Sequence, residues 1–274
     1  MNTKVYEIIT EKIIDQLESG SVPWVKPWIG GEPPKNYISK KPYRGINPFL
    51  LACQGYASPF WLSFKQAQAA GGTVKKGEKG SMVVFWKMFE GSELDKSGKP
   101  KMIPMLRYYT VFNTDQCEGL TVDLPTTGEE FQPIDKAESI VDGMQNKPVI
   151  RHAEPRAYYR PSTDLVNMPR KELFESAEGY YSTLFHELGH STGHKSRLER
   201  KDFAEAAFGS ETYSKEELIA EFTSAFLCGI SGIEKEIKNQ AAYIQGWLKV
   251  LKSDCKMAVL AAAQAQKAAD YITG

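Results

Sequence analysis

Residues 186 to 190 have the sequence His-Glu-Leu-Gly-His, which places two histidines four positions apart. On a helix such residues lie on one face, so both imidazoles can bind one metal ion while Glu187 lies beside them. Catalytic zinc sites use this arrangement, and their glutamate takes a proton from water. We predict that His186 and His190 bind one divalent metal ion, with zinc expected, and that Glu187 is catalytic.

A pattern this short also arises by chance, so its surroundings matter. The preceding turns carry an apolar side, and Gly193 is suited to end the helix. Because His194 follows that glycine, we predict that it lies outside the metal site. The residues that form the apolar side are Tyr180, Tyr181, Leu184, Phe185 and Leu188.

A tetrahedral zinc site of this kind needs a third protein ligand. The segment from Ser214 to Phe222 predicts a second helix, on which Glu217 and Glu221 share a face. One carboxylate can bind the metal while the other orients a ligating histidine. Ser214 and Glu217 also match a capping box, which would explain Glu217 structurally. The spacing leaves Glu217 and Glu221 as alternative metal ligands.

Peptide hydrolysis is the expected reaction of such a site. Residues 157–161 and 164–169 precede the His-Glu helix and predict short strands. They could supply a sheet edge that holds an extended peptide, although ordinary sheet structure explains them equally well.

The length of 274 residues allows two domains. A stretch rich in proline, glycine and acidic residues separates two regions of different composition, as linkers do. We predict an α+β protein with an N-terminal domain at 1–122, a linker at 123–134 and a C-terminal domain at 135–274.

The net charge of zero hides a difference between these regions. Residues 1–120 contain 16 basic and 11 acidic residues, and the remainder contains 18 and 23. The stretch from Trp24 to Lys87 has 10 basic residues against two acidic ones. This asymmetry indicates a polyanionic partner for the first domain.

Four of the five tryptophans, Trp24, Trp28, Trp61 and Trp86, lie in the same basic region. Proteins that bind single-stranded nucleic acid combine cations with aromatic rings on which bases stack. Because large rings also fill cores, we expect about half of these rings to be buried. Lys75, Lys76 and Lys79 lie in a glycine-containing turn, where they could contact phosphates or remain a solvated hairpin end.

Four further elements are expected around these residues. We predict a helix to about Ser19, a helix beginning near Ser63, and strands at 81–89 and 103–113 joined by a hairpin loop. The segment from Met257 to Tyr271 is expected to be helical.

The four cysteines are far apart and form no metal-binding pair, so we expect reduced thiols. The first residues predict an amphipathic helix with acidic positions rather than a signal peptide, and no apolar run reaches membrane-spanning length. We therefore expect a cytoplasmic protein with no membrane partner.

Several motifs in the first region together resemble the N-terminal domain of the ArdC family of antirestriction proteins. The second region resembles that family's zincin-like metallopeptidase domain. The first resemblance is carried by residues 23–28, 43–47, 61–67 and 74–78, and the second by 186–190, 216–221, 242–244 and 247–248.

The resemblance implies a protein of a plasmid or phage that binds single-stranded DNA and shields incoming DNA from host restriction endonucleases. A DNA-directed zinc metalloprotease that cleaves DNA-bound or host defence proteins is the alternative. The residues expected to contact DNA are Trp24, Trp28, Lys40, Lys41, Tyr43, Arg44, Asn47, Trp61, Lys65, Gln66, Lys75, Lys76 and Lys79.

Overall fold

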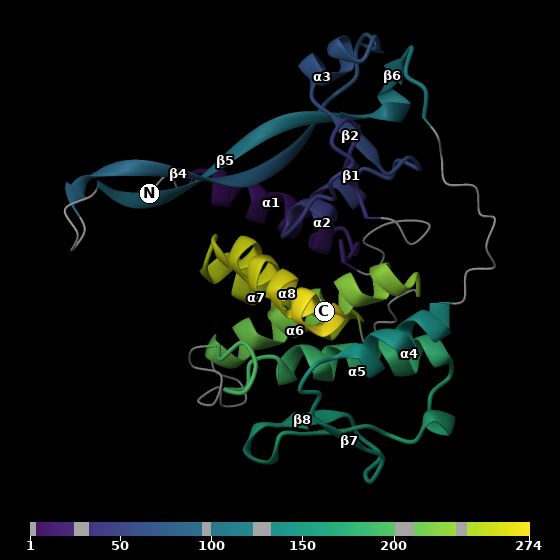
Figure 1. Cartoon of the computed structure of the whole chain (residues 1–274). Coiled ribbons are helices and arrows are strands. Elements are labelled where there is room, and N and C mark those ends of the chain that lie inside the picture. The colour runs from purple at the N-terminus through teal and green to yellow at the C-terminus, as the bar shows by residue number, and fades with distance from the viewer. Residues whose placement is uncertain (1–3, 25–32, 95–99, 123–132, 201–210, 234–239) are drawn as a thin grey trace.

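The computed structural model describes residues 4–24, 33–94, 100–122, 133–200, 211–233 and 240–274, and the fold is given for these ranges (Figure 1). It combines helices and sheets in an α+β architecture, as predicted. None of the helices in these ranges is both long and apolar enough to cross a membrane.

The N-terminal half consists of helix α1 and a four-stranded sheet with two small helices. Val5, Ile9, Ile13 and Leu17 recur every four residues along α1 and are all buried, because this spacing forms one apolar stripe. The sheet has the strand order β1-β2-β5-β4. The elements are α1 (Lys4–Glu18), β1 (Lys35–Asn36), α2 (Asn47–Ala52), β2 (Phe60–Leu62), α3 (Phe64–Ala69), β3 (Thr73–Val74), β4 (Ser81–Leu94), β5 (Pro100–Asn113) and β6 (Cys117–Glu118).

The long β4–β5 hairpin projects from the body of the molecule (Figure 1). Its antiparallel register pairs Ser81 with Val111 and Trp86 with Leu106. Both strands were predicted, but each is longer than expected at its outer end, so the expected loop of 91–101 is shorter. Residues 95–99 of that loop lie outside the described part of the chain.

The predicted helix near Ser63 is also present. Ser63 caps α3 by accepting a hydrogen bond from the backbone N–H of Gln66, and the Gln66 side chain returns one from the Ser63 N–H. This capping box fixes the start of the helix.

The C-terminal half has a small sheet beneath a group of helices (Figure 1). The sheet order is β7-β9-β8, so β8 is an edge strand that pairs antiparallel with β9. The elements are α4 (Pro133–Gly143), β7 (Val149–Arg151), β8 (Tyr158–Arg160), β9 (Leu165–Asn167), α5 (Ala177–Ser191), α6 (Glu211–Ser231), α7 (Gln240–Ser253) and α8 (Met257–Thr273). Strands β8 and β9 confirm the prediction from the sequence, as does the C-terminal helix α8.

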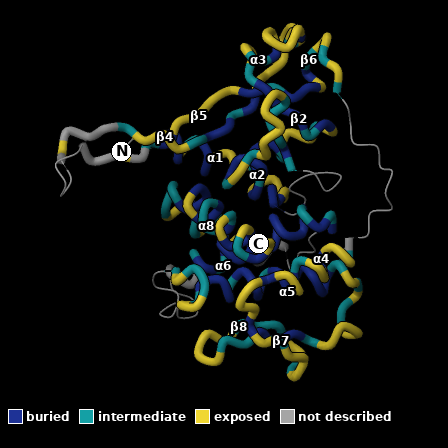
Figure 2. Tube along the Cα trace, viewed as in Figure 1, coloured by how far each residue is buried: buried dark blue, intermediate teal, exposed yellow. Residues whose placement is uncertain are grey.

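One apolar core joins the two halves, as the buried segments in the middle of Figure 2 show. Trp24 is fully buried, with its ring centroid 4.8 Å from that of Phe222 in α6 and 4.9 Å from that of Trp247 in α7. Phe49 of α2 stacks on Phe226 of α6 at 4.8 Å. The two halves are therefore packed together, and residues 123–132 of the expected linker lie outside the described ranges.

Candidate functional site

Helix α5 carries the His-Glu-Leu-Gly-His segment in its last turns. Ser176 caps its start by accepting a hydrogen bond from the Gly179 N–H. The helix ends at Ser191, just before Gly193, as predicted. His186 and His190 consequently lie one turn apart on one face, with Glu187 between them in sequence.

Helix α6 crosses α5 at close range, and Gly189 permits this approach. A Cβ atom at position 189 would lie 3.1 Å from Cβ of Thr223 and 3.2 Å from Cα of Ala220. A side chain there would therefore push the two helices apart. The glycine brings the carboxylates of α6 within reach of the histidines of α5.

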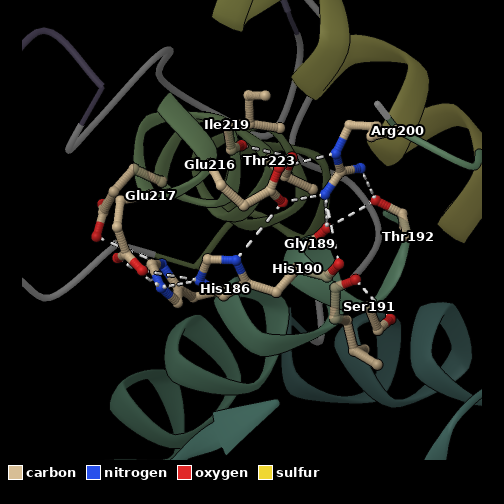
Figure 3. A network of polar contacts seen from close by, with 12 residues as sticks. His186, Gly189, His190, Ser191, Thr192, Arg200, Glu216, Glu217, Ile219 and Thr223 are labelled. Carbon is tan, nitrogen blue, oxygen red and sulfur yellow. Dashed lines mark hydrogen bonds and ion pairs between the residues drawn. The ribbon is translucent and has the colours of Figure 1, made fainter. Parts of the chain in front are cut away.

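Glu217 completes a convergent group with both histidines (Figure 3). The two Nε2 atoms of His186 and His190 are 3.1 Å apart. The Glu217 carboxylate oxygens lie 3.6 Å from Nε2 of His186 and 3.3 Å from Nε2 of His190. In the described part of the chain, these three residues form the group whose ligand atoms lie within 4.8 Å of one another.

Glu221 lies on the other side of the His186 ring. Its carboxylate is 3.4 Å from Nδ1, the nitrogen that points away from the convergent group. A carboxylate at this position fixes the orientation of a ligating imidazole. The geometry favours Glu217 as the third metal ligand, and it places Glu221 where it can orient the ring of His186. The spacing in the sequence had left these two residues as alternative ligands.

The capping-box explanation of Glu217 is wrong. Helix α6 begins at Glu211, three residues before Ser214, so Ser214 lies inside the helix rather than at its cap. His194 behaves as predicted, because its Nδ1 lies 2.8 Å from Oγ of Ser196 in the turn after α5.

Glu216 and Arg200 support His190 in a similar way, and no role was predicted for either residue. A Glu216 oxygen is 3.6 Å from Nδ1 of His190. Arg200 forms an ion pair with Glu216 and donates a hydrogen bond to the carbonyl of Gly189 at 3.0 Å (Figure 3). Both side chains are nearly buried, so their charges are paired away from water. The only signal in the sequence is that Glu216 directly precedes Glu217.

Hydrogen bonds dominate the titration of the metal-free group. Burial would lower the pKa of His186, but hydrogen bonds to Glu217 and Glu221 raise it to about 10. The pKa of His190 is raised to about 9, because bonds to Glu216 and Glu217 also outweigh burial. Burial opposes the shift of Glu217, whose pKa its bonds to both histidines hold well below the usual range.

Glu187 lies apart from the ligand atoms and is 7% exposed. Burial raises the pKa of its carboxyl, against the nearby positive charges of His186 and His190. The backbone of Tyr159 in edge strand β8 is near enough to lower this pKa slightly. The candidate general base thus lies close to an edge strand, which is where an extended peptide can pair.

Arg197 holds that strand in place. Its fully buried side chain forms an ion pair with Asp164, which directly precedes β9, and donates to the carbonyl of Ser191 at 2.7 Å. Tyr159 donates from its hydroxyl to Asp164 at 2.7 Å. These bonds attach the β8–β9 hairpin to the end of α5, and so fix β8 relative to Glu187.

The donor atoms fit a divalent metal ion. Two imidazole nitrogens and one carboxylate oxygen form a ligand set that suits zinc and other transition metals. An ion held there supplies Lewis acidity, which polarises a carbonyl group and lowers the pKa of water. The outer carboxylates of Glu221 and Glu216, which lie beside the Nδ1 atoms, are those expected around ligating histidines.

Three of the residues expected to contact DNA have structural roles instead. Trp24 and Trp61 are 0% and 2% exposed, so neither ring offers a face to a base in this structure. The Asn47 side chain is buried, and it bonds the backbone N–H and carbonyl of Val84 at 2.7 Å each. Burial in the core corrects these three expectations.

Other expected DNA residues are accessible. Tyr43 and Gln66 are half-buried, and Gln66 is engaged in the cap of α3. Arg44 forms an ion pair with Asp270 of α8, and Lys75 donates to the carbonyl of Asp115 at 2.8 Å. Trp28 lies outside the described residues. The exposed lysines of the expected set are Lys40, Lys41, Lys65, Lys75, Lys76 and Lys79.

The fold and the site define the class of the C-terminal half. The model of the zincin-like metallopeptidase family matches residues 135–265, which contain both histidines and Glu217. Residues 3–112 match the model of the N-terminal domain of the anti-restriction factor ArdC. The molecule is thus a zincin-like domain joined to an ArdC N-terminal domain.

The chain belongs to the ArdC antirestriction family. It is similar to the crystal structure of the antirestriction ArdC protein from plasmid R388 in its metal-free form, with 41% identity and a TM-score of 0.78 over 97% of this chain and 96% of that one. The Mn(II)-bound structure of that protein matches with 40% identity and a TM-score of 0.75 over the same shares. Together with the ligand group, these matches indicate a divalent metal ion at the site.

Three curated proteins are also similar to this chain in sequence. Two proteins named DNA primase TraC, both from Escherichia coli, are 41% and 40% identical over 97% of this chain. The chain spans 27% and 20% of their lengths. A protein from Sinorhizobium fredii (strain NBRC 101917 / NGR234), named uncharacterized protein y4eC, is 36% identical, and the match covers 98% of this chain and 92% of that protein.

Proposed function

We propose that this protein binds single-stranded DNA and protects DNA that enters a cell on a mobile element from host restriction endonucleases. The observation that carries the proposal is the match over 97% of the chain to the ArdC protein of plasmid R388. The excess of basic residues in 1–120 supports a polyanionic partner for this half. The four cysteines are free, in keeping with a cytoplasmic location.

Binding of single strands is tested with the full chain and labelled oligonucleotides of one and two strands, by fluorescence anisotropy across a salt series. We expect preference for single strands, with affinity that falls as salt rises because phosphate contacts release counterions. The preference should persist after chelation, since the metal group lies on α5 and α6 of the other half. Equal or absent binding of both oligonucleotides would refute the proposal.

The metal centre supports a second candidate function, that of a DNA-directed zinc metalloprotease acting on a host protein. In this proposal His186, His190 and Glu217 hold the zinc ion, while Glu221 and Glu216 orient the two imidazoles. Glu187 takes a proton from water during attack on a peptide carbonyl. The observation that favours this candidate is the position of Glu187 near the backbone of edge strand β8, where an extended peptide could lie.

Glu187→Ala separates the two candidates, because Glu187 lies outside the ligand group and its loss should leave the metal bound. Loss of a general base typically slows a reaction by about 100- to 10,000-fold. We expect zinc-loaded wild type to cleave denatured casein in the presence of single-stranded DNA, and the variant to be inactive with unchanged zinc content. Equal cleavage by both proteins would show that Glu187 is not the general base.

A further inference from the structure

One face of the β4–β5 hairpin combines aromatic and basic side chains. The register pairs Val83 with Tyr109 and Phe85 with Arg107. Directly paired residues of an antiparallel sheet project to the same side, and every second residue along a strand does so too. Ile103 and Met105 also project to this side. The side chains there that carry a ring or a positive charge, which together we call the aromatic face, are Phe85, Lys87, Phe89, Arg107 and Tyr109.

The rings and cations of the aromatic face alternate in space. Phe85 and Tyr109 stack with their centroids 4.3 Å apart and their planes inclined by 15°. Beyond them, the Phe89 ring has Nζ of Lys87 at 5.3 Å and the guanidinium of Arg107 at 5.2 Å from its centroid. Phe85 and Phe89 are about 13 Å apart along the strand. The face thus offers two ring positions with two cations between and beside them.

The aromatic face is open to solvent at Tyr109 and at its two cations, whereas Phe85 and Phe89 are half-buried. Its inner end is buried, where Val83 and Val111 pack against Leu51 and Trp61. Farther out, Lys87 and Arg107 are exposed and Tyr109 is 57% exposed. The exposed segment of β5 can be followed in Figure 2.

The opposite side of the hairpin has a different role. Val84 and Leu106 belong to the main core, and the Trp86 ring lies 6.2 Å from Tyr6 of α1. Tyr108 also projects to this side, because it pairs with Val84. The hairpin therefore attaches to the body through one side and presents the aromatic face on the other.

The aromatic face continues into a groove of about 820 Å³. Phe85 and Tyr109 line this groove together with Tyr43 and Arg44 and with Val259 and Lys267 of α8. Val84, Trp86 and Leu106 of the opposite side line it as well, so the groove reaches both sides of the hairpin. Arg44 forms an ion pair with Asp270 of the same helix. Both halves of the chain thus contribute to one concave surface that bears rings and cations.

We propose that the aromatic face and this groove form the binding surface for single-stranded DNA. Unpaired bases stack on the Phe85–Tyr109 pair and on Phe89, and phosphates contact Lys87 and Arg107. This inference rests on the proposed DNA binding and names the surface that performs it. Stacking requires bases with free faces, which single strands offer and duplexes do not.

Charge complementarity supports a nucleic acid as the occupant. The side chains that project to the aromatic face at 81–89 and 103–111 include two cations and no acidic residue. An apolar protein partner would not need the cations, and an acidic peptide would not need the stacked rings. A strand of nucleic acid satisfies both, because each nucleotide carries a planar base and a negative phosphate.

Tyr109→Ala tests the stacking, with Tyr108→Ala as its matched control. The two tyrosines are neighbours with exposed fractions of 57% and 53%, but they lie on opposite sides of the hairpin. With a labelled thymidine 20-mer and the full chain, we expect Tyr109→Ala to weaken binding by about 5- to 150-fold. Tyr108→Ala should change the affinity by less than about twofold, and Tyr109→Trp should retain it because tryptophan also stacks.

Arg107→Gln tests the phosphate contact. We expect the slope of log affinity against log salt to become shallower by about 0.7, the value for one phosphate of a single strand. Arg160→Gln is the control, because Arg160 is an exposed arginine over the Tyr158 ring at 5.1 Å on β8. Its slope should equal that of wild type.

The outcomes separate this inference from the function on which it rests. Wild type that fails to bind the 20-mer overturns both. Wild type that binds, with Tyr109→Ala and Arg107→Gln behaving like wild type, overturns the aromatic face alone. Equal weakening by Tyr108→Ala and Tyr109→Ala also overturns it, whereas loss in Tyr109→Ala with recovery in Tyr109→Trp supports it.

Discussion

The metal centre and the aromatic face have opposite designs. The metal centre lies between two helices that Gly189 brings into contact, and carboxylates beside the outer ring nitrogens orient its imidazoles. The aromatic face lies on a projecting hairpin with its cations and Tyr109 exposed and its two phenylalanine rings half-buried. A buried site can hold one small ion in fixed geometry, whereas an exposed surface suits a long and flexible polyanion.

The core between the two regions gives the largest expected effect. Trp24→Ala removes a fully buried ring that contacts Phe222 and Trp247, and we expect a loss of about 3–5 kcal/mol in the free energy of unfolding. Trp86→Ala is the control, since that ring is 43% exposed and its loss should cost about 1 kcal/mol or less. Urea denaturation measures both. Similar losses in the two variants would contradict a shared core around Trp24.

The next effect concerns the two carboxylates of α6 that face His186. Glu217→Ala removes a donor of the convergent group and should weaken metal binding by more than about 100-fold. Glu221→Ala removes only the partner of Nδ1, and we expect a loss of about 10- to 100-fold. Competition with a fluorescent chelator measures the affinities. The reverse order would assign the third ligand to Glu221.

The close helix contact predicts a smaller effect on stability. In Gly189→Ala the new methyl group would meet Thr223 and Ala220, so we expect a destabilisation of about 1–3 kcal/mol. Gly246→Ala in α7 introduces the same group into open space and should stabilise the protein by about 0.5–1 kcal/mol. Thermal unfolding of both metal-free variants measures the difference. A neutral Gly189→Ala would show that α5 and α6 can separate without cost.

The pH dependence of metal binding tests the carboxylate contacts that distinguish the metal centre from the exposed aromatic face. Without metal, hydrogen bonds to carboxylates outweigh burial and raise the pKa of His186 to about 10 and that of His190 to about 9. Because a metal ion binds neutral imidazole, binding at neutral pH should release these protons. Affinity should therefore rise with pH by about tenfold per unit for each proton released. Calorimetry in buffers of different ionisation enthalpy counts the protons, and a count of zero would contradict the carboxylate pairing.

The same raised pKa values should make the metal-free protein less stable as pH rises, whereas metal affinity increases. Their contribution to stability is fully present below the ordinary histidine value of 6.5 and is lost as pH rises through about 9 and 10. We expect the thermal midpoint of the metal-free protein to fall between pH 7 and pH 10 more than that of His186→Gln. An equal fall in both proteins would contradict this source of stability.

The metal centre was largely predictable from sequence because its geometry is local. A spacing of four on one helix places both histidines on one face, and the fold only had to supply a neighbouring carboxylate. The choice between Glu217 and Glu221 depends on how α6 is rotated about its axis against α5, which the spacing does not specify. The apparent capping box at Ser214 was misleading, because α6 starts at Glu211. Arg200 and Glu216 depend on tertiary contacts that no short pattern encodes.

The proposed DNA surface was harder to predict because composition does not show which side of an element is exposed. The predicted aromatic and basic region is present, but the core contains Trp24 and Trp61. Phe85 and Tyr109 are 24 residues apart, and the hairpin register alone brings them together. Side chains alternate between the two sides of each strand, so this alternation could have placed Phe85 and Tyr109 on one side once the strand pairing was known.

Transfer of an unmodified plasmid into a restricting host tests the central claim, that DNA protection and the metal centre are separable. The donor or recipient would produce wild type, Glu187→Ala or no protein, and the fraction of transferred plasmid that survives would be counted. We predict that Glu187→Ala protects as well as wild type. Loss of protection in a folded, metal-loaded Glu187→Ala protein would contradict it and assign protection to the hydrolytic site.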